Sequence, residues 1–307
     1  MVRFIVMRLI QTVVALVGIA MLIFTLVRVS GDPALMLATA TSTEEDIQRI
    51  RVNLGLDKSL PEQFWIFVTD VVQGDLGDSL FKQKPVTGMI RDALPNSIKL
   101  VFPSWGIAML GALLLGVLGA TRRDSIWDNG VKFIAVLGQA LPGFWVAIVA
   151  VYFFSVRWQL LPTSGLGGID HYILPVATMA FFLLPGMMRL VRSSMLDVLD
   201  SEYIKMARIK GLPERIIIWK HALRNALIAP LTVAGMLFAG LITGAVIIET
   251  VFSWPGVGWI LVEGVLARDF PLVQAITLLV AVVVLGINLL VDITYAYIDP
   301  QIRYQKT

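Results

Sequence analysis

The sequence predicts an all-α integral membrane protein with six transmembrane helices. It also predicts an external helical subdomain between the first two of these helices and a cytoplasmic helix-turn-helix between the fourth and fifth. Three observations support this fold class: 57% of the 307 residues are hydrophobic, only 15% are charged, and six long stretches contain no Asp, Glu, Lys or Arg. A soluble domain is typically about 45–50% apolar and about 25% charged.

The six uncharged stretches are 17 to 24 residues long, and a helix needs about 20 apolar residues to cross the hydrocarbon core. They are Leu9–Val27, Leu100–Ala120, Phe133–Val156, Tyr172–Met188, Ala226–Ile248 and Leu272–Val291. The first follows Arg3 and Arg8, as a secretory signal would. However, it exceeds the about 7–15 residues of a signal's apolar core and lacks a small-residue cleavage site. We expect it to be retained as the first transmembrane helix.

Lysine and arginine gather in one set of connecting segments. The amino terminus, 121–132, 189–225 and the carboxyl-terminal tail hold 15 of them, whereas the short loops on the other side hold only Arg157 and Arg268. Cytoplasmic loops carry this excess, so we expect both termini on the cytoplasmic side of a bacterial inner membrane. The net charge of +3 then reflects topology and not nucleic-acid binding.

These segments divide the chain into four parts. We expect a cytoplasmic amino terminus with the first helix at 1–29 and an external helical subdomain at 30–97. The core with the other five transmembrane helices follows at 98–298, and a cytoplasmic tail at 299–307 ends the chain.

The external segment carries its own helix signals. Ser42-Thr43-Glu44-Glu45 resembles a capping box, and Gly55 is expected to end the helix that it opens. A second helix is expected to open at Pro61 and end near Gly74. The subdomain either braces the outer ends of the transmembrane helices or receives an extracytoplasmic partner, and the sequence leaves both roles open.

The cytoplasmic segment 189–225 predicts two short helices outside the membrane. Acidic residues stand toward the start of the first and basic residues at its end, as the helix dipole favours; they are Asp197, Asp200 and Glu202, then Arg208 and Lys210. Gly211 is expected to end the first helix in the left-handed conformation, and Pro213 to open the second.

A stripe of shrinking side chains runs along the first of these short helices. Tyr203, Ala207 and Gly211 are spaced four residues apart and therefore share one helix face. Such a stripe allows a partner protein to approach the backbone closely. The alternative is a loop that only fixes membrane orientation through its charge, although that role requires neither caps nor a small-residue face.

The residues for enzyme, metal and nucleotide chemistry are missing from the sequence. The chain has no cysteine, and His171 and His221 are its only histidines. No Gly is followed by Lys, so a phosphate-binding G-x-x-x-x-G-K-[ST] loop is excluded. We therefore expect no thiolate or multi-histidine metal site, no cysteine nucleophile and no ATP binding through such a loop.

The six stretches also lack the ionisable groups on which proton or sodium coupling normally depends. Glu249 and Asp292 lie at the ends of two stretches, where we expect them at the membrane interface. Polar side chains within the stretches either line a pathway or join helices by hydrogen bonds. These candidates are Gln139, Thr178, Thr243 and Asn288.

The segment Glu202–Leu212, followed by His221–Ala226, resembles the EAA loop of permeases from binding-protein-dependent ABC importers, in the dipeptide, oligopeptide and nickel branch. The resemblance covers the whole chain and favours the first of the two permeases in such systems. Further matching motifs are Gly31–Ala34, Leu54–Asp57, Gly74–Gly77, Leu161-Pro162, Arg192–Ser194, Glu249–Gly258, Arg268–Pro271 and Asp299-Pro300.

The resemblance implies a non-catalytic subunit that holds no cofactor of its own and pairs with a homologous second permease. Two cytoplasmic ATPases, or one fused pair, would bind ATP and Mg, and an extracytoplasmic binding protein would deliver the substrate. The EAA loop, here 192–225, would dock on the ATPase and transmit its closure. The motif positions are Glu202, Tyr203, Ala207, Lys210, Gly211 and Leu212.

The sequence departs from the EAA pattern at three places. Glu202-Tyr203-Ile204 replaces a literal E-A-A triplet, Leu223-Arg224 replaces the family's Leu-Pro, and Ala229 precedes Pro230 where relatives often have Ile. These departures concern the geometry of the second short helix.

The resemblance implies peptides as the cargo, either di- or oligopeptides. Nickel chelates, glutathione and oligosaccharides are the alternatives, because similar permeases carry them. The rival functions are a stand-alone channel or secondary carrier and a membrane anchor for a cytoplasmic enzyme. A neighbouring gene with a phosphate loop and another with a secretory signal would favour the importer.

Overall fold

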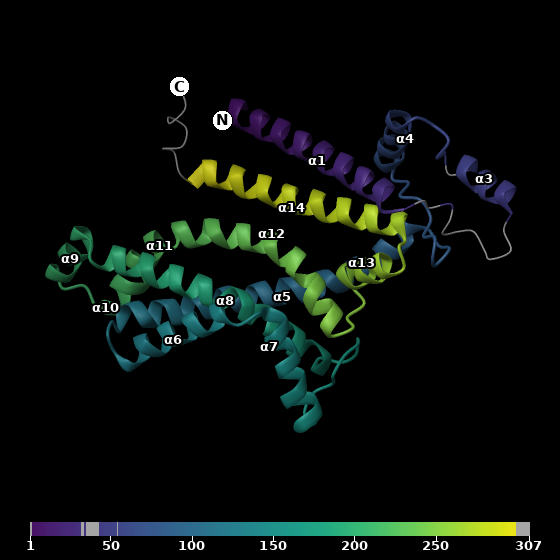
Figure 1. Cartoon of the computed structure of the whole chain (residues 1–307). Coiled ribbons are helices and arrows are strands. Elements are labelled where there is room, and N and C mark those ends of the chain that lie inside the picture. Colours follow the sequence, from purple (N-terminus) through teal and green to yellow (C-terminus); the bar gives the residue numbers. More distant parts are fainter. Residues whose placement is uncertain (1, 32–33, 35–42, 54, 299–307) are drawn as a thin grey trace. The chain divides into compact units, whose positions relative to one another are not determined.

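The computed structural model describes residues 2–31, 34, 43–53 and 55–298, and helices dominate this part of the chain (Figure 1). The helices are α1 (Val2–Ser30), α3 (Glu44–Asn53), α4 (Leu60–Gln73), α5 (Val86–Thr121), α6 (Ile126–Ala140), α7 (Gly143–Ala150), η1 (Val151–Arg157), α8 (Asp170–Leu199), α9 (Glu202–Ile209), α10 (Glu214–Ile216), η2 (Ile217–Ala222), α11 (Leu223–Ala226), α12 (Ile228–Val251), α13 (Val257–Leu266) and α14 (Phe270–Ile298). The predicted tail at 299–307, with Asp299-Pro300, lies outside the described residues.

Five helices in the described part are long and apolar enough to cross a membrane. They are the helices α1, α5, α8, α12 and α14. A sixth candidate is the pair formed by 126–140 and 143–157, which bends by 101° between its two parts. The chain is therefore an all-helical membrane protein with five or six candidate spans.

The predicted span Phe133–Val156 is not one straight helix. α6 ends at Ala140 and α7 begins at Gly143, with Pro142 as its N-cap in the extended conformation. Proline lacks the N–H that a continuous helix would require, and its ring clashes with the preceding turn. The apolar composition identified a membrane segment, whereas Pro142 and Gly143 carried the signal for the break.

The described chain forms two compact units. The first comprises Ser97–Pro255 with the end of the chain from Ile287, and the second comprises Val2–Asn96 with Gly256–Gly286. α5 and α14 contribute residues to both units.

In the first unit, α8 is the central helix, and α6, α7 and α12 pack against it. Glycines allow the closest approaches. A Cβ at Gly138 of α6 would lie 2.3 Å from Pro185 Cγ, and a Cβ at Gly116 of α5 would lie 2.8 Å from Val191 Cβ. Close packing at small residues is a common way for membrane helices to associate.

α8 extends well beyond the predicted span Tyr172–Met188. It continues past Arg192 to Leu199 without a break and leads directly into the cytoplasmic loop. Asp197 therefore lies in the last turn of α8, and Asp200 is its C-cap. The prediction that both acids stand at the start of the next helix is wrong, whereas Glu202 does lie in the first turn of α9.

In the second unit, the aromatic side chains of α4 pack against α1. Phe24 contacts Phe64 with ring centroids 5.4 Å apart and Phe67 with centroids 6.0 Å apart. The amino-terminal part of α5 packs on α13 and α14 through a buried cluster that includes Val86, Ile260 and Ile276.

The two predicted helices of segment 30–97 are confirmed, with a change in one cap. Ser42 lies outside the described residues, and the capping partners are Thr43 and Asp46, one residue later than predicted. Thr43 N donates to Asp46 Oδ2 at 3.0 Å, and Asp46 N donates to Thr43 Oγ1 at 3.3 Å. Hydrogen bonds from Thr43 hold the pKa of Asp46 below its ordinary value. Gly55 and Gly74 follow the ends of their helices, as predicted, and the structure gives both a positive φ.

Candidate functional site

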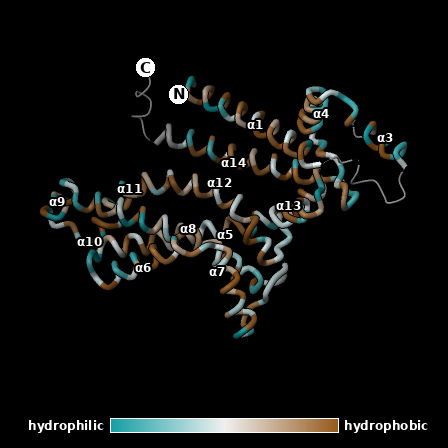
Figure 2. The backbone as a smooth tube through the Cα atoms, viewed as in Figure 1, coloured by the Kyte–Doolittle hydropathy of each residue, from teal (hydrophilic) through white to brown (hydrophobic). Residues whose placement is uncertain are grey.

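The loop between α8 and α12 forms a capped helical projection at one end of the first unit (Figure 1). α9 follows Ser201, which stands at the N-cap with extended backbone. Lys205 Nζ lies 2.8 Å from Glu202 Oε1, and this hydrogen bond raises the pKa of Lys205. Figure 2 shows a mixture of hydrophilic and hydrophobic residues here, in contrast to the predominantly hydrophobic α12.

Gly211 ends α9 in the predicted left-handed conformation, with φ of +75°. Gly211 N donates to Arg208 O at 2.9 Å, and Leu212 N donates to Ala207 O at 3.3 Å. This pair of bonds is a Schellman motif, which satisfies carbonyls left open at the end of a helix. Apart from Gly211 itself and its neighbours along the chain, no heavy atom of the described residues would lie within 4 Å of a Cβ at this position. The backbone at Gly211 requires a residue that tolerates positive φ, whereas the space around Gly211 would admit a side chain.

The second predicted helix begins after Pro213, as expected, but it is not short. α10 continues into η2, a π-helical segment, and then into α11. Arg208 of α9 closes the turn between the two helices by an ion pair with Glu214, with 2.8 Å between Nε and Oε1.

Two contacts hold α9 against the rest of the first unit. Ile204 is completely buried in a cluster with Met195 of α8 and Ile217 of η2. Tyr203 Oη accepts a hydrogen bond from Asn225 Nδ2 at 2.7 Å and lies 3.4 Å from His221 O. Tyr203 therefore anchors α9 to α11, an interaction that its place in the predicted stripe did not indicate.

The other predicted positions do not form a continuous exposed stripe of small residues. Ala207 is half-buried against the same cluster, whereas Gly211 and Lys210 are exposed. Large apolar side chains are exposed beside them: Met206 is 54% exposed, Ile209 78% and Leu212 36%. We call Met206, Ile209 and Leu212 the apolar tip. Met206 and Ile209 were not among the predicted site residues, although large apolar side chains next to Lys205, Arg208 and Lys210 were a usable signal.

The four polar residues considered for a pathway are not joined to one another by any hydrogen bond of the described chain. Thr178 is buried, and its hydroxyl donates to Leu174 O at 2.8 Å within its own helix. Gln139 and Thr243 are exposed, and Asn288 is half-buried. A pathway role for these residues stays a prediction.

Glu249, which was expected at a membrane interface, is enclosed by protein, and its depth in the membrane stays a prediction. Its side chain is completely buried near the end of α12, and Ser97 Oγ of α5 donates to its Oε1 at 2.6 Å. Asp292 is half-buried in α14. The position of Glu249 at the end of an apolar stretch could not reveal that α5 covers it.

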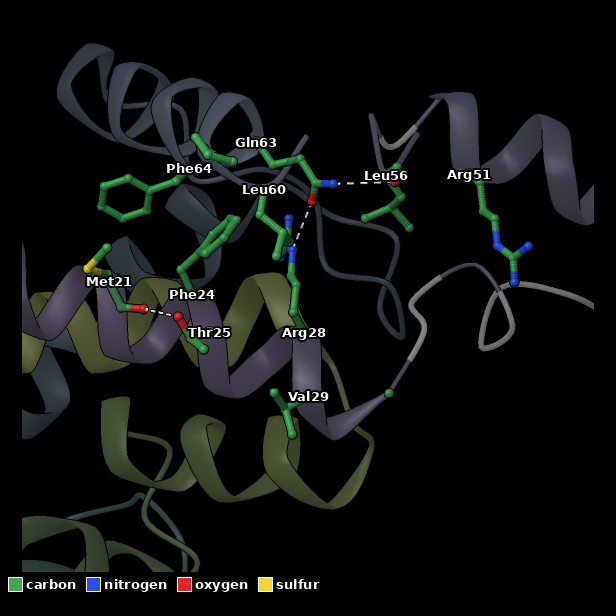
Figure 3. Close-up of a pocket in the computed structure, with 12 residues that line it drawn as sticks. Met21, Phe24, Thr25, Arg28, Val29, Arg51, Leu56, Leu60, Gln63 and Phe64 are labelled. Atoms are coloured by element: carbon green, nitrogen blue, oxygen red, sulfur yellow. Dashed lines mark hydrogen bonds between the residues drawn. The ribbon is translucent and has the colours of Figure 1, made fainter. Parts of the chain in front are cut away.

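The second unit contains a mostly apolar cavity of about 760 Å³ between α1 and α4 (Figure 3). Arg28 Nε donates to Gln63 Oε1 at 3.1 Å, and the guanidinium lies 4.1 Å from the centre of the Phe24 ring. Gln63 Nε2 in turn donates to Lys58 O at 2.8 Å and to Leu56 O at 3.3 Å. A buried glutamine thus connects the end of α1 to the turn before α4.

Asp269 forms a further polar connection within this unit. Its carboxylate accepts a hydrogen bond from Ser79 Oγ, and it also accepts from Leu80 N at 3.1 Å and Phe81 N at 3.3 Å. Lys82 Nζ pairs with Glu263 Oε2 at 2.6 Å. Together these bonds fasten the loop before α5 to α13 and to the start of α14.

Comparison with known families and proteins gives a match over nearly the whole chain. Residues 112–304 match the model of the binding-protein-dependent transport system inner membrane component, and residues 1–101 match the model of its amino-terminal part. A peptide transport system permease protein of Brucella abortus (strain 2308) is 39% identical, with 97% of this chain and 98% of that protein covered. The glutathione transport system permease protein GsiC of Pectobacterium atrosepticum is 38% identical, with 99% and 100% covered.

Solved structures share the fold of about two thirds of this chain. The MetNI methionine ABC transporter, solved in inward-facing conformations, matches with a TM-score of 0.59 at 18% identity, covering 69% of this chain and 96% of that chain. An amino acid ABC transporter solved with histidines matches with a TM-score of 0.57 at 14% identity, covering 69% and 94%.

Proposed function

The chain belongs to the family of binding-protein-dependent transport system inner membrane components, and we propose that its cargo is di- or oligopeptides. As a multi-pass inner membrane permease of an ABC importer it is non-catalytic, so ATP hydrolysis belongs to partner ATPases. In our proposal it forms the pathway with a homologous second permease. Two ATPases, separate or fused, lie beneath, and an extracytoplasmic binding protein delivers the peptide.

The observation that supports peptides most directly is the 39% identity, over 97% of this chain, to a protein named as a peptide transport permease. Glutathione is the second candidate, because permeases named for it are 37% to 38% identical over 99% of this chain. Both candidates are peptides in the broad sense.

For the topology, we propose six spans with both termini in the cytoplasm. This count takes the bent pair of α6 with α7 and η1 as one span. Its support is the 15 lysines and arginines in the amino terminus, 121–132, 189–225 and the tail, against two in the other short loops, because cytoplasmic loops carry such an excess.

For the coupling to ATP hydrolysis, we propose that α9 docks on an ATPase subunit. The proposed contact residues are Glu202, Tyr203, Ala207, Lys210, Gly211 and Leu212, to which the exposed side chains of Met206 and Ile209 are added. Exposed apolar side chains that a partner buries are the usual centre of a protein interface.

The contacts of α9 explain how its motion would reach the membrane helices. Ile204 packs against α8, and Tyr203 is hydrogen-bonded to α11, which leads into α12. Closure of the ATPases would therefore move α8 and α12 together with α9. The two access states of the pathway must differ in these contacts, since ATP can bias an equilibrium only through such differences.

The test is reconstitution of this chain in liposomes with its second permease, its ATPases and the binding protein encoded beside it. We expect ATP-dependent uptake of a peptide that raises the melting temperature of that binding protein. The isolated chain should bind no nucleotide. Uptake at the same rate without the ATPases, or stoichiometric ATP binding by the isolated chain, would refute the proposal.

A further inference from the structure

Arg28, in the last turn of α1, is a half-buried cation without an acidic partner in the described chain. Its Nε donates to Gln63 Oε1, and its guanidinium lies over the Phe24 ring. Gln63 is only 8% exposed and Phe24 only 4%, so two buried side chains fix the orientation of the guanidinium. Among the described residues, Nη1 and Nη2 have no hydrogen-bond acceptor. They are therefore available to an acceptor from outside the chain.

This guanidinium belongs to the wall of the mostly apolar cavity of about 760 Å³ between α1 and α4 (Figure 3). Met21 of α1 and Leu60 and Phe64 of α4 supply apolar surface. Of the described residues that line the cavity, only Arg28 and Arg51 are charged, so the lining contains two cations and no acid. Such a cavity fits a molecule that joins an anionic group to an apolar chain.

The face of α1 that carries Arg28 is apolar and exposed over the preceding turns. Val14, Gly18, Met21 and Arg28 share this face, because they are spaced three, four or seven residues apart. Val14 is 64% exposed and Met21 58%, and in the described chain nothing would lie within 4 Å of a Cβ at Gly18. Gly18 and Arg28 are separated by about 15 Å along the helix, at 1.5 Å per residue. This separation equals half of the hydrocarbon core of a bilayer, which is about 30 Å thick.

The position of Arg28 indicates which amphiphile fits. α1 is a candidate membrane span over Arg3–Val29, so its last turn lies at the level of the lipid headgroups. Arginine suits a phosphate group because it offers paired N–H donors in a fixed geometry. Both charged residues of the lining are arginines. They favour a headgroup of net negative charge over a zwitterionic one, whose ammonium group the same arginines would repel.

We propose that the cavity between α1 and α4 binds an anionic phospholipid of the outer leaflet. Its phosphate accepts hydrogen bonds from Nη1 and Nη2 of Arg28, and Arg51 adds positive charge near the headgroup. One acyl chain lies between α1 and α4 and continues along the face of α1 that carries Met21 and Val14. The lipid thereby joins the external subdomain to the first membrane helix. The choice of leaflet rests on the proposed topology, whereas the site itself is independent of the cargo.

The binding test uses the complete importer, purified in detergent and depleted of lipid. Dioleoyl-phosphatidylglycerol is titrated in, and native mass spectrometry counts the molecules that stay bound. We expect the wild-type complex to hold one molecule more than the same complex with Arg28→Gln. Dioleoyl-phosphatidylcholine has the same chains and phosphate but a zwitterionic headgroup, and it should bind this site at least tenfold more weakly. Equal affinity for the two lipids would overturn the proposal.

Matched variants separate this site from general attraction of lipid to the protein. Arg8→Gln is the control for Arg28→Gln, because Arg8 also lies on α1 over a phenylalanine ring, 5.5 Å from the centre of Phe4, but does not line the cavity. Met21→Trp should weaken phosphatidylglycerol binding at least tenfold, since the larger side chain occupies the place of the acyl chain. Leu22→Trp is its control, because Met21 and Leu22 are both 58% exposed and only Met21 lines the cavity. Both control variants should keep the additional lipid molecule.

Three results in these experiments would count against the site. Equal loss of lipid in Arg8→Gln and Arg28→Gln would show a general attraction to cations of α1. Phosphatidylglycerol affinity that is the same in Met21→Trp as in Leu22→Trp would show that no acyl chain occupies the cavity, and this comparison decides the matter if Arg28→Gln does not assemble. An additional lipid on the isolated chain but not on the complete importer would show that a partner subunit covers the cavity.

Discussion

Asp128 of α6 and Arg192 of α8 form an ion pair whose carboxylate is completely buried. Arg192 Nε lies 2.5 Å from Asp128 Oδ1, and Nη2 lies 2.9 Å from Oδ2. Lys132 Nζ and Asp124 N complete the shell of Oδ2 at 2.8 Å and 3.0 Å. The pair joins α6 to α8 about two turns before α8 enters the loop that carries α9.

Asp128 and Arg192 should contribute to the free energy of unfolding as a pair, so that the effects of their substitutions are not additive. Asp128→Ala should cost about 3 kcal/mol, because it leaves the charge of Arg192 partly buried without its partner. Arg192→Ala added to Asp128→Ala should cost much less than it does alone. The measurement is a double-mutant cycle on thermal or denaturant unfolding of the purified chain in detergent.

Asp197→Ala is the control for this cycle, because Asp197 is exposed on the same helix and lies near its carboxyl-terminal end. It should leave stability unchanged or slightly raised, since an acid at that end opposes the helix dipole. Additive losses for Asp128→Ala and Arg192→Ala would show that the pair does not act as a unit.

Gly211 should tolerate small changes but not bulk. Gly211→Ala costs about 1–2 kcal/mol of local backbone strain, so we expect partial transport activity and normal membrane insertion. Gly211→Trp should also insert normally, since its own chain leaves open space at this position. We expect it to lose both transport and co-purification of the ATPases, because the bulk opposes docking.

Gly211→Asn separates the backbone effect from the contact effect, since asparagine tolerates the left-handed conformation. Activity close to the wild type would assign the role of Gly211 to its φ, and loss of activity would assign it to the contact. Gly165→Trp is the matched control, because Gly165 has φ of +83° and equally open surroundings. Wild-type import by Gly211→Trp with its ATPases bound would exclude a coupling role for this position.

Asp269 should fix the loop before α5. Asp269→Asn removes a charged acceptor from the amides of Leu80 and Phe81, and hydrogen bonds to charged groups contribute about 1.5–3 kcal/mol. We expect the loop to open locally and trypsin to cleave after Lys82 at least tenfold faster. Asp92→Asn, at an exposed position of α5, should cleave at the wild-type rate.

The topology can be checked with reporter fusions. Fusions at Gly77 and Gly211 should report opposite sides of the membrane, and a fusion at Gly165 should report the same side as Gly77. The fusion at Gly165 tests whether the bent pair of α6 and α7 crosses the membrane. If the pair entered and left through the same face, Gly165 would report the same side as Gly211. Gly77 and Gly211 on one side would refute the proposed orientation.

Local sequence signals predicted the fold elements well where one residue decides the outcome. Gly55, Gly74 and Gly211 end their helices because a positive φ is accessible chiefly to glycine. Uncharged stretches located the membrane helices, because a helix that crosses the hydrocarbon core carries few charged side chains. Pro142 indicated a break in the third predicted span, which hydropathy alone did not show. Asp46, and not Glu45 as predicted, caps the start of α3.

The candidate site was predictable in its local helix but not in its tertiary contacts. The cap of α9 followed from Gly211, whereas the bond of Tyr203 to Asn225 and the burial of Ile204 depend on how the following helix folds back. Asp128 and Arg192 lie 64 positions apart in the chain. Residue type could not show that these two charges meet, or that α5 covers Glu249.

The most direct test of the coupling role is a cross-link from the apolar tip to an ATPase subunit. The chain contains no cysteine, so Ile209→Cys gives this subunit a single thiol, which benzophenone-maleimide labels before the subunit is assembled with its partners. We predict that light attaches this subunit to an ATPase and that ATP changes the yield. Val72→Cys, on an exposed position of α4, should give no ATPase product. If Ile209→Cys gives no more ATPase product than Val72→Cys, the assignment of α9 as the coupling helix is wrong.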